Sequence, residues 1–287
     1  MIYGLVAAMG WGLSDLWATI SGRRIGSFRT VVVAQIAAAI AVGLLALAVR
    51  PDLSRLSVVI PWLVANAFIA SAAFAILYRA LELGPIAIVS PVLATYAVVP
   101  VLLSVVLLGE SLGLWEIAGA AITIVGAVLA STDIRAIRAG TRTPAAGLPL
   151  AVVSMLLFGV ATYVTGWAAQ QAGFLPSLLF GRLTMAAVFV VAAIVIRFRV
   201  KPGTAVDRPA WSSMRLAVLV GLLELLGTIS YARGAEVGLV SIVTAASATY
   251  PLIPVLGGVI VLHERPAPTQ FIGVALVIGG LMLLGLS

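Results

Sequence analysis

The chain has no cysteine, a single histidine and few charged residues. Only 9% of its 287 residues are charged, whereas soluble domains average about 25%. Without cysteine, disulfide and thiol chemistry are excluded, and one histidine leaves no cluster of histidine ligands for a metal. The P-loop, H-E-x-x-H and Gly-x-Ser-x-Gly patterns are also missing. We therefore expect no cofactor, no enzyme activity and no ATP-driven step on this chain.

Apolar residues make up 62% of the chain, and the mean hydropathy is +1.21. Apolar stretches of about 20 residues recur, and each is long enough to cross the hydrocarbon core of a bilayer as a helix. The sequence therefore predicts an all-α integral membrane protein. We place its ten spans at 2–20, 30–49, 58–78, 86–108, 113–131, 147–168, 175–196, 214–232, 239–262 and 267–286.

The net charge of +7 would suggest a nucleic-acid partner in a soluble protein. Here the cations lie in short gaps between apolar spans, so the bilayer is the partner they indicate. The positive-inside rule places the gaps after odd-numbered spans in the cytoplasm and both termini outside. We expect the membrane to be the bacterial inner membrane. The odd gaps hold 13 of the 17 cations: Arg23, Arg24, Arg29, Arg79, Arg135, Arg138, Arg142, Arg197, Arg199, Lys201, Arg208, Arg215 and Arg265.

The sequence contains an internal repeat. Residues 79–126 align without a gap with residues 233–280, a shift of 154, and the matches include Arg, Glu, Tyr and Pro as well as apolar residues. The first spans align at a shift of 147. We divide the chain into a first repeat (1–131), a polar loop (132–146) and a second repeat (147–287). Because each repeat has five spans, the second enters the membrane inverted, as in many secondary transporters. One chain carries both repeats, so a monomer can suffice.

Within both copies, one segment resembles the ten-span drug/metabolite transporter superfamily, specifically its EamA type. The shared features are Pro100 in the fourth span, Gly109-Glu110 at its end, and Gly119 and Gly126 in the fifth span. The second copy, from residue 238 to residue 280, departs from this pattern only where His263-Glu264 replaces Gly-Glu. The resemblance implies ten helices around a central cavity and export of small metabolites by alternating access.

Two acidic residues stand out within the apolar spans. Glu224 lies at the centre of the eighth span and Asp15 in the cytoplasmic third of the first. A carboxylate at mid-membrane costs about 2.5–3.5 kcal/mol on insertion scales, so a functional role is the default interpretation. Their repeat partners, Ala70 and Thr162, are not acidic. Arg182 in the seventh span is long enough to reach Glu224, either as a ligand or as a purely structural partner.

Helical spacing groups further polar and aromatic residues with these charges. Glu224, Thr228 and Tyr231 share one helix face, and Tyr163 shares another with Trp167. Trp62, Trp115 and Trp11 instead suit the aromatic belts at the membrane surface. The predicted substrate-binding set is Glu224, Asp15, Trp17, Tyr163, Trp167, Thr228, Tyr231, Tyr96, Tyr250 and Arg182.

Other charged residues occur in both copies and are predicted to be structural. Two pairs have i, i+3 spacing near a span end. Two single acids lie at the membrane surface. These residues are Arg79, Glu82, Arg233, Glu236, Glu110 and Glu264.

The predicted function is a secondary transporter that exports a small, amino-acid-like or amine-bearing solute. Two alternatives stay open: a proton-coupled antiporter of cationic drugs, and a flippase for lipids or lipid-linked sugars. A buried carboxylate that faces water can bind a proton or an amine. Arg182 beside it favours binding of an amine or zwitterion over obligatory proton exchange.

Overall fold

A computed structural model describes residues 2–99, 113–130, 147–199, 211–237, 247 and 249–284. These residues contain ten α-helices, one in each expected span, which confirms the all-α fold. Only parts of the fourth and ninth spans are described, as α4 with η1 and as α12. The elements are α1 (Ile2–Ile25), α2 (Ser27–Val49), α3 (Leu56–Leu83), α4 (Ile86–Ala94), η1 (Thr95–Ala97), α6 (Leu114–Ala130), α8 (Leu148–Ala172), α9 (Phe174–Arg199), α10 (Trp211–Val237), α12 (Leu252–Ile260) and α13 (Pro268–Leu284).

The outer surface of the bundle is apolar and its interior contains polar groups. Five helices, α2, α3, α8, α9 and α10, are long and apolar enough to cross a membrane. Large apolar side chains such as Leu47 and Trp115 are exposed, whereas Gln35, Thr19 and Arg182 are buried. A protein whose polar side chains are inside and whose apolar side chains are outside is suited to a bilayer.

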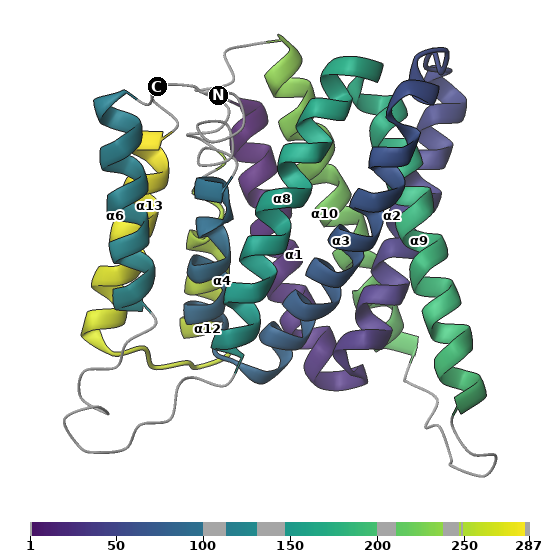
Figure 1. Cartoon of the computed structure of the whole chain (residues 1–287). Coiled ribbons are helices and arrows are strands. Elements are labelled where there is room, and N and C mark those ends of the chain that lie inside the picture. The colour runs from purple at the N-terminus through teal and green to yellow at the C-terminus, as the bar shows by residue number, and fades with distance from the viewer. Residues whose placement is uncertain are drawn as a thin grey trace.

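The helices pack in pairs that follow the internal repeat. In Figure 1, α1 begins and α13 ends at the same end of the bundle, and α6 lies beside α13. Helix α1 packs on α10, and the repeat-equivalent helices α8 and α3 also pack on each other. Three helices pack on their own repeat partners: α2 on α9, α4 on α12 and α6 on α13. This is the pattern that a twofold axis in the membrane plane produces.

Glycine contacts show the same symmetry at atomic detail. A Cβ atom at Gly126 would lie 2.8 Å from the backbone oxygen of Gly273, and one at Gly280 would lie 2.7 Å from that of Gly119. Gly119 and Gly126 are the repeat partners of Gly273 and Gly280, so the contacts exchange between copies. The α6–α13 crossing therefore requires glycine on both helices because their backbones touch.

Candidate functional site

A buried ion pair joins α9 to α10 near the pseudo-twofold axis. Arg182 Nη2 lies 2.6 Å from Glu224 Oε1, and the two side chains are only 7% and 12% exposed. Arg182 Nη1 also donates a hydrogen bond of 3.1 Å to Gln35 Oε1 on α2. Gln35 is the repeat partner of Arg182, so this bond connects equivalent positions of the two copies. The guanidinium carbon lies 5.7 Å from the centroid of the Phe74 ring, a cation–π contact.

Glu224 uses only one of its two carboxylate oxygens in these contacts. Oε1 accepts the bond from Arg182 and a second bond of 2.9 Å from Thr228 Oγ1. Oε2 is buried and has no hydrogen-bond partner among the described residues. A buried charged oxygen without a donor is costly, so Oε2 is suited to accept a bond from a ligand.

A hydrogen-bonded chain links this carboxylate to an aromatic cluster. Trp11 Nε1 donates to Thr228 Oγ1 at 3.3 Å, and Thr228 in turn donates to Glu224. The Trp11 ring packs against Tyr231, with centroids 5.6 Å apart, and against Tyr250 at 6.1 Å. Trp11 was predicted to suit the membrane-surface belt. In the structure its side chain extends from α1 and packs against α10 and against Tyr250, which precedes α12.

Asp15 lies on the same side of α1, which packs along α10. Ser14 Oγ donates to the backbone oxygen of Val220 at 3.1 Å, and this fixes the register of the two helices. Asp15 Oδ2 accepts a bond of 3.1 Å from Ser90 Oγ on α4, and the residue is 8% exposed. The sequence placed Asp15 close to the end of its span. The structure extends α1 to Ile25, five residues past the predicted span end at residue 20, so Asp15 lies ten residues before the end of the helix.

The other predicted binding residues are more widely spread. Tyr96 in η1 faces Phe158, with ring centroids 6.4 Å apart. Trp17 packs at the edge of the largest apolar core, and Tyr163 on α8 is half-buried. Trp167 stacks edge-on against Trp62 at 5.9 Å, and Trp62 is 58% exposed. Trp167 therefore belongs to a surface aromatic pair and contacts neither member of the ion pair in the structure.

Tyr78 on α3, which the sequence does not single out, lies against the charged cluster. It is fully buried, and its hydroxyl has no hydrogen-bond partner within the described part of the chain. Its ring packs edge-on against Phe74, the ring over which the Arg182 guanidinium lies. Its repeat partner is Ala232, so Tyr78 breaks the internal symmetry as Glu224 does. That asymmetry is the signal that identifies it.

Among the residues predicted to be structural, one helical pair and one single acid are described in full. Arg79 Nη1 lies 2.8 Å from Glu82 Oε2, which also accepts a bond from the backbone N–H of Ser27. Glu264 accepts the backbone N–H groups of Ile86 and Ala87, each at 3.0 Å. Glu110 and the side chain of Glu236, with which Arg233 was predicted to pair, lie outside the described residues.

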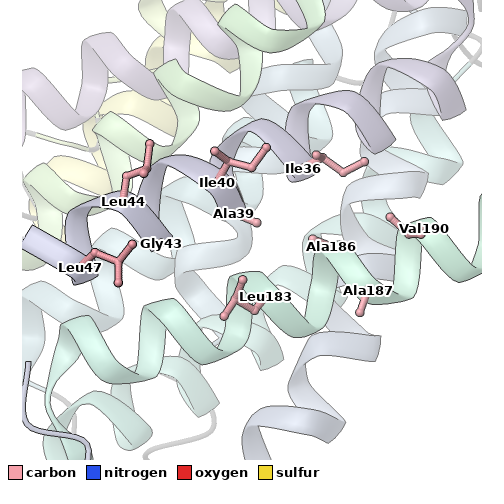
Figure 2. Close-up of a pocket in the computed structure, with 10 residues that line it drawn as sticks. All are labelled: Ile36, Ala39, Ile40, Gly43, Leu44, Leu47, Leu183, Ala186, Ala187 and Val190. Carbon is pink, nitrogen blue, oxygen red and sulfur yellow. The ribbon is translucent and has the colours of Figure 1, made fainter. Parts of the chain in front are cut away.

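An apolar groove opens between α2 and α9 on the outer surface (Figure 2). Ile36 and Leu183 line it, and they directly follow Gln35 and Arg182 in the sequence. All the side chains that line it are aliphatic, so it has no group to orient a polar solute. The groove is separate from the charged cluster, whose polar atoms point into the helix bundle.

Comparison with known proteins agrees with this architecture. The model of a family described as "EamA-like transporter family" matches residues 1–132 and 145–286. A solved structure titled "Crystal structure of protein" has a TM-score of 0.68 and 20% sequence identity, and the match covers 99% of this chain and 96% of that chain. At that identity the likeness concerns the fold alone. No curated protein matches the chain.

Proposed function

This chain belongs to the EamA-like transporter family, and from that premise we propose that it exports a small amino-acid-like or amine-bearing solute by alternating access. The observation that carries the proposal is the buried Arg182–Glu224 pair with its unpartnered Glu224 Oε2. Ionisable residues inside a membrane bundle are expensive and mark substrate or ion pathways.

The charge balance of the cluster favours a cationic group on the solute. Arg182 compensates Glu224, whereas Asp15 has no ion-pair partner within the described ranges. With both acids ionised, the cluster has one negative charge in excess. An ammonium group supplies the missing charge and can donate to Glu224 Oε2, which accepts no hydrogen bond from the described residues. The aromatic cluster around Trp11 lies beside it and offers an apolar wall for the rest of the solute.

The position of the cluster suits alternating access. Arg182 and Gln35 are repeat partners that meet where α2 packs on α9, so the ion pair lies near the axis that relates the two copies. In transporters with inverted repeats, the two halves exchange conformations around a site near that axis. A solute bound there can be exposed to one side of the membrane and then to the other.

Proton coupling is the second candidate, and Asp15 is the observation that favours it. Its carboxylate is buried and accepts a bond from one hydroxyl, and no cation of the described part of the chain pairs with it, so it can hold a proton in place of an amine. A cationic drug and a proton would then compete for the same charge. A lipid flippase has no comparable support, since the α2–α9 groove carries no cationic group for a headgroup.

Counterflow in proteoliposomes tests the proposal. The purified chain is reconstituted with an unlabelled mixture of amines, zwitterions or anions inside, and uptake of the matching labelled solute is measured. We expect uptake with amines or zwitterions and none with anions. Uptake of anions only, or scrambling of labelled lipids without solute movement, would refute the proposal. Dependence of uptake on an imposed pH gradient distinguishes proton antiport from simple exchange.

A further inference from the structure

Glu264 caps a helix of the other repeat. It lies in the loop between α12 and α13, in the second copy, yet its two carboxylate oxygens accept the N–H groups of Ile86 and Ala87, the first residues of α4. The residue at the N-cap position of α4 is Pro85, whose side chain makes no capping bond. The first N–H groups of a helix have no acceptor within the helix, and its positive end favours an anion. Glu264, from the second repeat, therefore supplies the acceptor for the first two N–H groups of α4, which belongs to the first repeat.

A third element joins the same contact. Arg23, in the last turn of α1, lies 3.2 Å from Glu264 Oε1 and donates a second bond of 2.8 Å to the backbone oxygen of Gly84. Gly258 on α12 is part of it too, because a Cβ atom there would lie 2.8 Å from both Glu264 Oε2 and Ile86 Cγ2. The two repeats are thus held tightly together at the end of the bundle opposite the start of α1 (Figure 1).

The loop that aims Glu264 is strained. His263 has φ = +57°, a left-handed conformation that glycine adopts freely and that other residues adopt at a cost. The repeat partner of His263 is Gly109, in the Gly-Glu pattern of the first copy. The second copy therefore keeps the glutamate but has histidine where the first copy has glycine, the residue that adopts this conformation without strain. We expect histidine to disfavour this loop conformation by about fivefold or more relative to glycine.

From these contacts we infer that Glu264 is a reversible latch that closes one end of the transporter between the two repeats. The inference rests on the proposed alternating access, because a fixed bundle has no need to release the contact. Opening this end separates α4 from α12, which requires Glu264 to leave the N–H groups of α4. The strain at His263 favours release and so limits how long this end stays shut. By the positive-inside rule, this end of the bundle, with the gaps after the odd-numbered spans, is the cytoplasmic one.

Spin-label distances test the latch without any substrate, so the result is independent of what the chain transports. The chain has no cysteine, so cysteines introduced at Leu83 and Pro268, both exposed, are the only labelling sites. These positions lie on either side of the latch, at the end of α3 and the start of α13. Pulsed electron–electron resonance on the reconstituted protein then gives the ratio of separated to closed populations.

Glu264→Gln removes the charge and one acceptor, and we expect it to raise that ratio about tenfold or more. Glu82→Gln is the matched control, since Glu82 also accepts a helix N–H and pairs with an arginine, but entirely within the first repeat. We expect the control to keep the wild-type ratio. His263→Gly in the Glu264→Gln chain should lower the ratio about fivefold, and His263→Val should raise it.

Three results would overturn the latch. The first is an unchanged distance distribution in Glu264→Gln. The second is an equal change in the Glu82→Gln control, which would show general loosening of this end. The third is a chain with both His263→Gly and Glu264→Gln that opens as much as Glu264→Gln alone. Because His263→Gly is expected to stabilise the closed end, the test does not depend on variants that fold poorly.

Discussion

The Arg182–Glu224 pair should be strongly coupled energetically, and a double-mutant cycle measures that coupling. The two charges are 2.6 Å apart, and the side chains are 7% and 12% exposed. Removing one partner of a buried pair costs about 3–5 kcal/mol, because the other charge stays buried and unpaired. Arg182→Gln leaves Glu224 with Thr228 alone, so we place that variant in this range. Glu224→Gln keeps an acceptor for Arg182 and should lie at its lower end.

The double variant replaces both charges with neutral amides that can still form hydrogen bonds. It should therefore be less destabilised than the sum of the two single variants. Close charge pairs that are desolvated show coupling energies of about 1.5–7 kcal/mol, whereas exposed pairs show about 0.2–1 kcal/mol. We expect more than 1.5 kcal/mol in the free energy of unfolding, measured for all four chains in one detergent. A value below 1 kcal/mol would mean that water screens the pair, and the buried site described here would be wrong.

Three further predictions concern packing, orientation and the aromatic cluster. Gly126→Ala should destabilise the protein or force α6 away from α13, because the new methyl group would overlap the α13 backbone. Gly279→Ala meets no atom within 4 Å and should be tolerated. The free energies of unfolding of the two variants are compared, and equal stability would contradict the described crossing. A reporter fused after residue 287 should appear outside the cell, as the cations in the odd gaps require; a cytoplasmic signal would invert the assignment. Trp11→Phe keeps an aromatic ring and loses the N–H to Thr228, so it should cost about 0.5–1.5 kcal/mol in unfolding; no change would show that this bond is not formed.

The charged residues inside the apolar spans could be identified from the sequence, because burial of a charge in a membrane has a high free-energy cost. Arg182 and Glu224 interrupt long apolar runs, and ionisable residues inside a membrane almost always face the bundle interior, where they pair with one another, with backbone carbonyls or with water. The sequence indicated that Arg182 is long enough to reach Glu224, and in the structure the two side chains are in contact. The repeat likewise indicated that Gln35 occupies the position equivalent to Arg182. The sequence did not show that the two residues touch, because that depends on how α2 packs on α9.

The features that depend on packing between the repeats were not predicted. The sequence around Trp11 is the same whether the side chain faces lipid headgroups or another helix. Its contact with α10 depends on how the two helices pack. The first span was predicted to end at residue 20, whereas α1 continues to Ile25, and the Ser90 hydroxyl that donates to Asp15 lies on α4, 75 residues away in the sequence. Glu264 was predicted to be structural because it recurs in both copies, but its partner is the start of a helix about 180 residues earlier in the chain. No local pattern contains that information.

Transport by the Glu224→Gln chain tests the central claim most directly. Wild-type protein, Glu224→Gln and the control Glu82→Gln are reconstituted at equal density, and counterflow of an amine that the wild type accepts is measured over a range of concentrations. Loss of a charge-assisted hydrogen bond of about 1.5–3 kcal/mol corresponds to about a 10- to 150-fold rise in the half-saturating concentration. We expect that rise in Glu224→Gln and wild-type behaviour in Glu82→Gln. Equal affinity in all three chains, with the Glu224→Gln protein folded and inserted, would contradict the account and leave Glu224 a structural residue.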